Sequence, residues 1–91
     1  AWVEYLIGKA RMMLRLHGQI NSRQEKVLLR MFKAGPNGFE GGLSADNYRT
    51  ISGATSATAT RDLSDLVEKC ALRRTGERKA TRYWIVLPET A

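Results

Sequence analysis

Apolar residues recur at helical spacing in two segments of the chain, residues 22–34 and 56–69. Steps of three and four residues place them on one face of a helix, which predicts two amphipathic helices that each bury one side. The apolar positions are Val27, Leu28, Met31 and Phe32 in the first segment and Ala59, Leu63, Leu66 and Val67 in the second. A shorter helical pattern over residues 44–52 lies between them. The centre of the chain is therefore predicted to be helical.

Residues 2–16 also predict a helix, but apolar residues occupy most of its circumference. Only a narrow polar strip remains, formed by Glu4, Arg11 and Arg15. A helix that is apolar over so wide an arc needs neighbours on several sides. We therefore expect it to pack on a preceding domain or on a second copy of the chain. This divides the sequence into residues 1–18, expected to be the end of a removed domain, and a domain over residues 19–88.

A capping signal opens the first amphipathic segment. Ser22 is followed three residues later by Glu25, the spacing of a capping box in which each side chain accepts a hydrogen bond from the backbone N–H of the other residue. Gly35 and Pro36 end this helix. Four glycines between residues 35 and 42 exclude a further helix there and indicate a loop or a short strand.

A short turn joins the next two helices. Ser44 can cap the helix over residues 44–52, and Gly53 can end it in the left-handed conformation. Thr55 or Ser56 then caps the following helix. Two helices joined by a turn of three or four residues that contains glycine are typical of a helix-turn-helix.

The end of the chain changes to the period of a β-strand. In residues 81–87, Tyr83, Ile85 and Leu87 alternate with Arg82, Trp84 and Val86. Residues 71–74 form a partner strand, and Gly76 lies in the turn between them. The predicted fold is therefore mainly α with a small β-hairpin (α+β): a winged helix-turn-helix, with the hairpin as its wing, preceded by an N-terminal helix.

The composition is that of an ordinary globular domain, with 91 residues, of which 43% are hydrophobic and 26% charged. No run of about eighteen apolar residues predicts a membrane span. Cys70 is the only cysteine and His17 the only histidine, which argues against an internal disulfide and a Cys/His metal site. We find no catalytic constellation and no cofactor motif. These features favour a reducing, cytoplasmic location and a chain that is not itself an enzyme.

Positive charge is concentrated at the two ends of the sequence. The net charge is +6. Residues 1–34 carry seven Lys and Arg against two acids, and residues 70–87 carry five against one, whereas residues 35–69 carry three against five. A basic balance of this kind favours a polyanionic partner, and we expect double-stranded DNA.

The helix over residues 56–69 begins with small and hydroxylated residues, "SATAT". In a helix-turn-helix the second helix enters the major groove, and its N-terminal residues meet the base edges. Small side chains let the helix approach DNA closely, and hydroxyls donate to phosphates or bases at many angles. Arg61 alone offers the bidentate contact to guanine. The candidate contact residues are Ser56, Ala57, Thr58, Thr60, Arg61 and Ser64.

Five basic residues lie on the predicted wing against a single acid, Glu77. Cations at this density favour contact with the phosphate backbone, which supplies affinity independent of sequence. The candidate wing residues are Arg73, Arg74, Arg78, Lys79 and Arg82.

Each of these residues also has a purely structural interpretation. Thr55, Ser56 and Thr58 can serve as helix caps without contacting a ligand. Arg61 can pair with Asp65 at i,i+4. The wing cations can form a face that contacts only solvent.

The charge of the predicted recognition helix, over residues 56–69, argues against strong DNA binding. Arg61 and Lys69 stand against three acids, Asp62, Asp65 and Glu68. Phosphate contacts would therefore have to come from the wing and the N-terminal half of the chain.

Four segments, "NSRQEKVL", "GFEGGLSADNY", "TATRDLSDLVEK" and "TRYWIV", resemble in order and spacing the C-terminal winged-helix region of Fic (filamentation-induced-by-cAMP) family proteins. The resemblance covers residues 20–87. Fic enzymes transfer AMP from ATP to a protein hydroxyl with an H-x-F-x-D-G-N-G-R-type loop, which these 91 residues lack. The resemblance therefore implies that AMP transfer belongs to the parent protein, and that residues 1–17 are the helical end of its catalytic domain.

Two functions follow from these observations. The first is a DNA-binding, transcription-regulator-like module appended to a Fic-type protein adenylyltransferase. The second is a protein-interaction or dimerisation module that regulates the Fic domain in cis, with a homodimer formed through the helix over residues 2–16. The acidic residues of the recognition helix and the apolar first helix favour the second.

Overall fold

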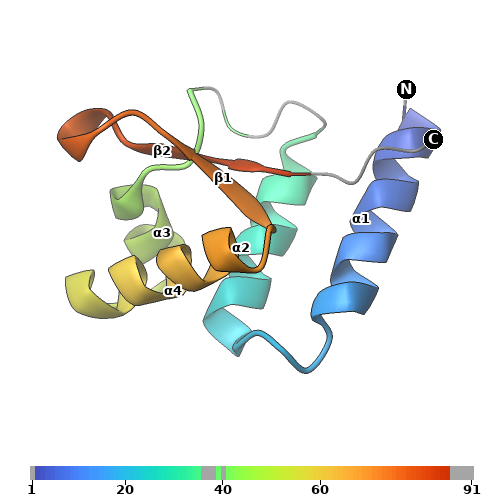
Figure 1. The fold of residues 1–91 in the computed structure, drawn as a ribbon, viewed down its shortest axis with the longest axis horizontal. Helices are drawn as coiled ribbons and strands as arrows, with labels where there is room; N and C mark the ends of the chain where they lie inside the picture. Colours follow the sequence, from blue (N-terminus) through green and yellow to red (C-terminus); the bar gives the residue numbers. More distant parts are fainter. Residues whose placement is uncertain (1, 36–38, 40, 87–91) are drawn as a thin grey trace.

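The computed structural model describes residues 2–35, 39 and 41–86. Within these residues, four α-helices precede a two-stranded antiparallel sheet, which confirms the predicted mainly α fold with a small β-hairpin (Figure 1). The elements are α1 (Trp2–Leu16), α2 (Ser22–Lys33), α3 (Ala45–Ser52), α4 (Ser56–Glu68), β1 (Leu72–Thr75), the 3₁₀ helix η1 (Arg78–Ala80) and β2 (Arg82–Ile85).

The helices and the hairpin surround one hydrophobic core. All four helices and both strands contribute buried residues to it. Those of α1 are Tyr5, Met12 and Leu16, so α1 packs on the same core as the rest of the chain. The molecule is 36 Å long, and Figure 1 shows α1 at one end of this axis, with the start of α4 and the tip of the hairpin at the other. None of the described helices is long and apolar enough to cross a membrane.

The N-cap of α2 is Asn21, one residue before the predicted cap. The Asn21 side chain accepts a hydrogen bond from the Gln24 backbone N–H at 2.8 Å, and the Gln24 side chain accepts one from the Asn21 N–H at 2.9 Å. The predicted box of Ser22 and Glu25 is therefore wrong. Asn caps a helix as well as Ser does, and Gln serves at the third position like Glu, so both pairs fit the same sequence signal.

The predicted caps of the helix-turn-helix are confirmed. The Ser44 hydroxyl accepts from the backbone N–H of Asn47 at 3.0 Å, and Gly53 ends α3 with a φ of 75°. Thr55, one of the two predicted caps of α4, accepts from the backbone N–H of Thr58. Three residues, 53–55, therefore separate α3 from α4, the short turn that this motif requires.

The hairpin is held to the rest of the domain by one further bridge. Leu43 exchanges two backbone hydrogen bonds with Tyr83, of 2.9 and 2.8 Å, so the loop before α3 adds a strand-like contact to β2. The pairing of β1 with β2 places Arg73 opposite Trp84 and Arg74 opposite Tyr83. Of the residues predicted for the second strand, Leu87 lies outside the described residues.

The wing turn depends on a glycine. Gly76 has a φ of 75°, and a Cβ at this position would lie 2.3 Å from the carbonyl oxygen of Ala80. The chain therefore turns from β1 into η1 at a point where no other residue fits without a backbone shift.

Candidate nucleic-acid interface

One side of α4 is anchored in the core and the other is open. Ala59, Leu63 and Leu66 are almost completely buried, and Val67 is partly buried against them. Five of the six predicted contact residues are exposed on the open side, and Thr58 is half-buried. The helical period of the sequence therefore predicted correctly which side of α4 faces away from the core.

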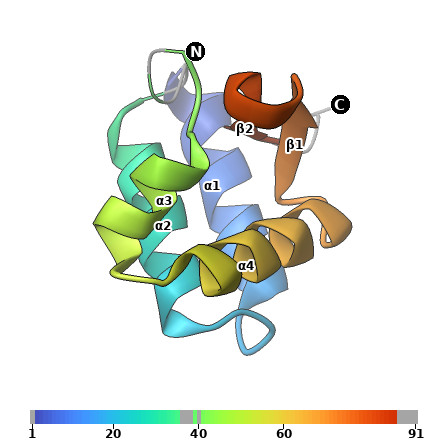
Figure 2. The same cartoon turned by 90° about the vertical axis from the view of Figure 1, so that its left-hand side faces the viewer.

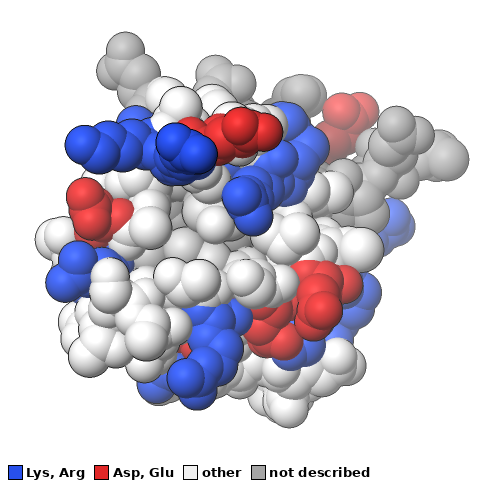
Figure 3. Space-filling model, turned by 60° about the vertical axis from the view of Figure 1, so that its left-hand side comes forward, with Lys and Arg blue, Asp and Glu red and all other residues white. Residues whose placement is uncertain are grey.

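An open groove of about 750 Å³ runs between this side of α4 and the wing. The beginning of α3 contributes to its wall through Ser44, Ala45 and Asp46. Figure 2 shows α4 crossing below the hairpin tip. Figure 3 shows Lys and Arg along the upper edge of this face, with acidic atoms among them, above a largely uncharged surface. Six of the eleven predicted site residues line the groove: Thr60, Ser64, Arg74, Arg78, Lys79 and Arg82.

Three basic side chains of the groove are available to a ligand. Arg74, Arg78 and Lys79 are exposed, and within the described chain their side chains take part in no hydrogen bond or ion pair. Arg82 has a different role, because its guanidinium donates to the backbone carbonyls of Lys79 at 3.0 Å and Thr81 at 2.8 Å. Arg82 therefore stabilises the wing tip on which the other cations lie.

Arg73 lies on the opposite face of the hairpin from the groove. Residues opposite each other in an antiparallel pair share a face, and neighbouring residues alternate. Arg74 therefore shares a face with the buried Tyr83, whereas Arg73 shares the outer face with Trp84. The Arg73 guanidinium lies 6.0 Å from the centroid of the Trp84 ring. Arg73 is therefore the one predicted wing residue that does not line the groove. Arg82, opposite Thr75, also begins on the outer face, but its side chain binds the wing tip and lines the groove.

Some hydroxyls at the start of α4 form hydrogen bonds within the described chain, and others do not. Thr55 caps the helix and also donates to the Thr58 hydroxyl at 3.1 Å. Thr60 donates to the backbone carbonyl of Ser56 at 3.1 Å. The capping interpretation therefore holds for Thr55, whereas Thr58 is the residue whose backbone N–H and hydroxyl bind this cap. The hydroxyls of Ser56 and Ser64 have no partner among the residues described.

Arg61 is not paired with Asp65. The Asp65 carboxylate instead accepts hydrogen bonds from the Lys69 ammonium and, at 2.9 Å, from the Gln24 side-chain amide. These two contacts lower the pKa of Asp65 below its usual range. Arg61 is exposed, and we find no ion pair for it in the part of the chain that the structure describes. Its guanidinium therefore remains available for a base or a phosphate.

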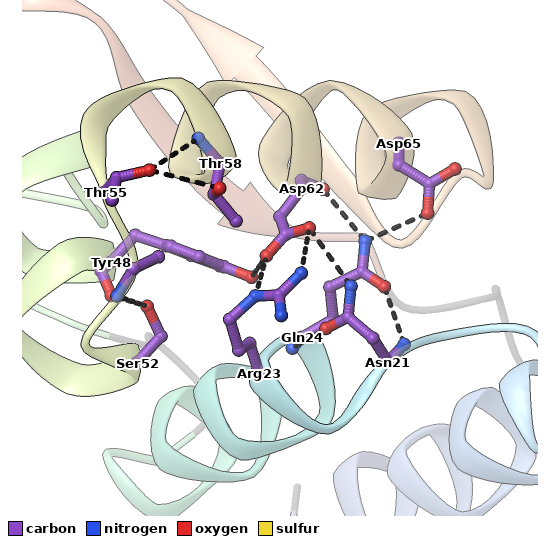
Figure 4. A network of polar contacts seen from close by, with 10 residues as sticks. Asn21, Arg23, Gln24, Tyr48, Ser52, Thr55, Thr58, Asp62 and Asp65 are labelled. Atoms are coloured by element: carbon purple, nitrogen blue, oxygen red, sulfur yellow. Dashed lines mark hydrogen bonds and ion pairs between the residues drawn. The ribbon is translucent and has the colours of Figure 1, made fainter.

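Asp62, one of the three acids that the sequence places on this helix, is buried. Its side chain points away from the groove, into a polar network between α2, α3 and α4 (Figure 4). Its carboxylate accepts hydrogen bonds from Tyr48 Oη at 2.7 Å, Arg23 Nε at 2.9 Å and Asn21 Nδ2 at 3.0 Å. Gln24 donates to its backbone carbonyl at 3.0 Å. The capping residues of α2 thus also hold α4.

The network keeps Asp62 ionised in spite of its burial. Burial alone would raise the pKa of this carboxyl, but the hydrogen bonds from Arg23, Tyr48 and Asn21 outweigh it and lower the pKa below the ordinary value. Burial and the bond to Asp62 raise the pKa of the Tyr48 hydroxyl. The negative charge of Asp62 is therefore neutralised locally by Arg23.

The burial of Asp62 changes the charge that the surface of α4 displays. Asp62 is turned inward, and Asp65 is engaged by Lys69 and Gln24. The only exposed charged side chain between Ser56 and Ser64 is Arg61. The net negative charge counted along the segment is therefore not displayed on the exposed surface of the N-terminal half of α4.

Comparison of the chain with protein-family models gives no match, and comparison with curated protein sequences gives none. The described residues contain no group of three or more His, Cys, Asp and Glu side chains that could hold a metal ion.

Proposed function

We propose that this chain is a winged-helix module that binds double-stranded DNA, with α4 in the major groove and the wing on the adjacent phosphates. One observation carries the proposal: Thr60 and Ser64, on the open side of α4, line the same groove as three unpaired basic side chains, Arg74, Arg78 and Lys79. Helix-turn-helix proteins read bases with the second helix, and phosphate contacts fix its register.

The first turns of α4 fit a close approach to base edges. Ser56, Ala57 and Thr60 are small and exposed, so they leave room for the helix axis to enter the groove. Arg61 follows as the one long side chain with a free guanidinium, the group that pairs with the O6 and N7 atoms of guanine. We therefore assign sequence preference to Arg61 and affinity to the wing.

Fluorescence anisotropy on a labelled duplex at several salt concentrations tests the assignment to the wing. Removal of one phosphate-binding cation should reduce the slope of log K against log salt by about 0.9. The double variant Arg78→Ala/Lys79→Ala should therefore lower the slope by about 1.8. Lys26→Ala/Lys33→Ala removes the same charge from exposed positions of α2 outside the groove and should change the slope much less. Equal effects of the two pairs would refute the wing contact.

A second candidate function is favoured by a different surface. α1 exposes large apolar residues, with 67% of Val3 and 78% of Leu14 accessible to solvent. A surface of this kind favours a module that binds protein and thereby positions or restrains a larger parent chain.

The proposed DNA-binding function includes a parent protein of the Fic type, to which this chain would be appended. It rests on the four segments that resemble the C-terminal region of that family. The coding sequence upstream of residue 1 tests it directly. An H-x-F-x-D-G-N-G-R-type loop there supports a protein adenylyltransferase that carries this module, and a long upstream frame without such a loop contradicts it.

A further inference from the structure

The outer face of α1 carries a continuous apolar seam. Val3, Ile7, Ala10 and Leu14 follow one another at steps of four, three and four residues, the spacing of a helix–helix contact of the coiled-coil type. Val3, Ile7 and Leu14 are 67%, 40% and 78% exposed. Leu6, 52% exposed, widens the seam on one flank. Three large apolar side chains in line and a fourth on the flank of a helix of 15 residues are more than the scattered exposure of a monomer surface.

The rest of the domain fixes the orientation of this seam. The opposite side of α1 is anchored by Tyr5, Met12 and Leu16, which are all 5% exposed or less. The Tyr5 hydroxyl also donates to the backbone carbonyl of Phe32 on α2. α1 therefore cannot rotate to bury the seam without pulling these three side chains out of the core.

The two flanks of the seam differ in chemistry. Leu6 and Met13 lie on one flank, and Glu4 and Arg11 lie on the other, because residues seven apart fall on the same side of a helix. When two such helices pack antiparallel, each flank meets the same flank of the other copy. Leu6 then faces Met13 of the second copy, and Glu4 faces Arg11 of the second copy. A parallel pair would instead set the charged flank against the apolar flank.

We propose that α1 is a self-association surface, and that two copies of the chain pair antiparallel along Val3, Ile7, Ala10 and Leu14. The pairing places Val3 of each copy beside Leu14 of the other. An apolar hollow of about 300 Å³, lined by Met13, Leu14, Leu16 and Ile20 together with His17 and Glu25, lies beside Leu14 and can receive the incoming side chains. The contact follows one helix of 15 residues, about 22 Å long. An interface this small belongs to the weak, transient class, so we expect the dimer to be reversible.

The dimer has a consequence for the DNA interface that rests on the proposed function. α1 lies at one end of the long axis of the molecule, and the wing and the start of α4 lie at the other (Figure 1). A two-fold axis beside α1 therefore puts the two DNA-binding surfaces at opposite ends of the dimer, facing apart. Such a dimer joins two separate duplexes, whereas a dimer that reads one site needs its recognition helices about 34 Å apart on the same side.

Sedimentation velocity over a range of protein concentrations tests the self-association. The wild-type chain should shift from monomer to dimer, and Ile7→Glu or Leu14→Glu should weaken the dimer at least tenfold. Leu29→Glu is the matched control, because Leu29 is a 41% exposed apolar residue on α2, away from the seam. A wild-type chain that stays monomeric at millimolar concentration, or equal effects of all three variants, would overturn the proposal.

Cysteine cross-linking tests the antiparallel orientation. In a Cys70→Ser background, which removes the only native cysteine, the variants Val3→Cys and Leu14→Cys are oxidised separately and as a mixture. The mixture should give a cross-linked heterodimer, and each variant alone should stay largely uncross-linked. Rapid cross-linking of Val3→Cys with itself would indicate a parallel pair and overturn this arrangement.

Two duplexes with different dyes separate this proposal from the DNA-binding one. Energy transfer between the dyes that appears with the wild-type chain and disappears with Leu14→Glu supports both self-association through α1 and DNA binding. A dimer that binds no DNA refutes the proposed function and leaves the dimer intact. A monomer that still binds DNA refutes only the dimer.

Discussion

The buried carboxylate of Asp62 provides the strongest test of how α4 is held. We consider Asp62→Ala, which removes the acceptor shared by Tyr48, Arg23 and Asn21. The Arg23 side chain is 41% exposed and can turn to water, so the broken ion pair contributes little. Tyr48 is fully buried, and its hydroxyl would be left without its acceptor, at a cost of about 1–3 kcal/mol.

The total destabilisation follows from these contributions. The lost hydrogen bond from Asn21 and the looser packing around the shortened side chain add to the cost at Tyr48. We therefore expect Asp62→Ala to reduce the free energy of unfolding by about 2–4 kcal/mol. For a domain of this size each kcal/mol lowers the midpoint of thermal unfolding by about 4–8 °C, so we expect a decrease of roughly 8–32 °C. Thermal and urea unfolding, followed by circular dichroism, measure both quantities. Asp46→Ala is the control, because its pair with Arg49 is long, 3.8 Å, and Asp46 is 91% exposed, so the destabilisation should stay below about 1 kcal/mol.

The pH dependence of stability gives an independent check. The pKa of Asp62 is lower in the folded chain than its value of about 3.9 in an unfolded chain. Its charge therefore stabilises the fold fully above about pH 5, and this stabilisation is lost as the pH falls through the folded pKa. The difference between wild type and Asp62→Ala should narrow below about pH 4. A difference that does not change with pH, or an effect no larger than that of Asp46→Ala, would refute the role given to the network.

Three further variants test local features of the fold and the site. Asn21→Ala should reduce the free energy of unfolding by about 1 kcal/mol or more, because Asn21 caps α2 and also binds Asp62, whereas Ser22→Ala should leave it nearly unchanged in urea unfolding. Gly76→Ala should distort the wing turn, since its Cβ would meet the Ala80 carbonyl, and anisotropy should show weaker DNA binding while the helical circular dichroism stays normal. Arg61→Ala should reduce the preference for a cognate over a mismatched duplex by about 1–3 kcal/mol and leave the salt slope almost unchanged.

The order of the elements could be predicted from the sequence because short-range signals determine it. Gly53 in the left-handed conformation is a common helix end, and the apolar residues Ala59, Leu63 and Leu66 recur at helical spacing on the buried side of α4. The cap of α2 was misplaced because two adjacent residues, Asn21 and Ser22, both satisfy the same local pattern. Only the tertiary contact of Asn21 with Asp62 separates them.

The separation of the wing residues shows a second limit of sequence reasoning. Charge density predicted all five cations of the wing as one phosphate-binding group, but Arg78 and Lys79 lie in η1, and only the strand residues alternate between the two faces of the hairpin. Pairing with Trp84 directs Arg73 outward, and pairing with Tyr83 directs Arg74 toward α4. Strand alternation thus separates Arg73 from Arg74, but it would also place Arg82 on the face of Trp84. Arg82 reaches the groove through its contacts with the wing tip, which no local sequence signal reveals.

Asp62 shows how the charge of a recognition helix should be counted. Summed along the segment, the acids outnumber the bases, which argued for weak DNA binding. Asp62, however, follows Ala59 by three residues and precedes Leu66 by four, so it falls on the buried stripe of the same helix. An acid inside an apolar stripe predicts a buried partner, and the basic and amide residues at the start of α2 provide it. Counted by face, the N-terminal half of α4 presents one exposed charge, that of Arg61, to a negatively charged ligand.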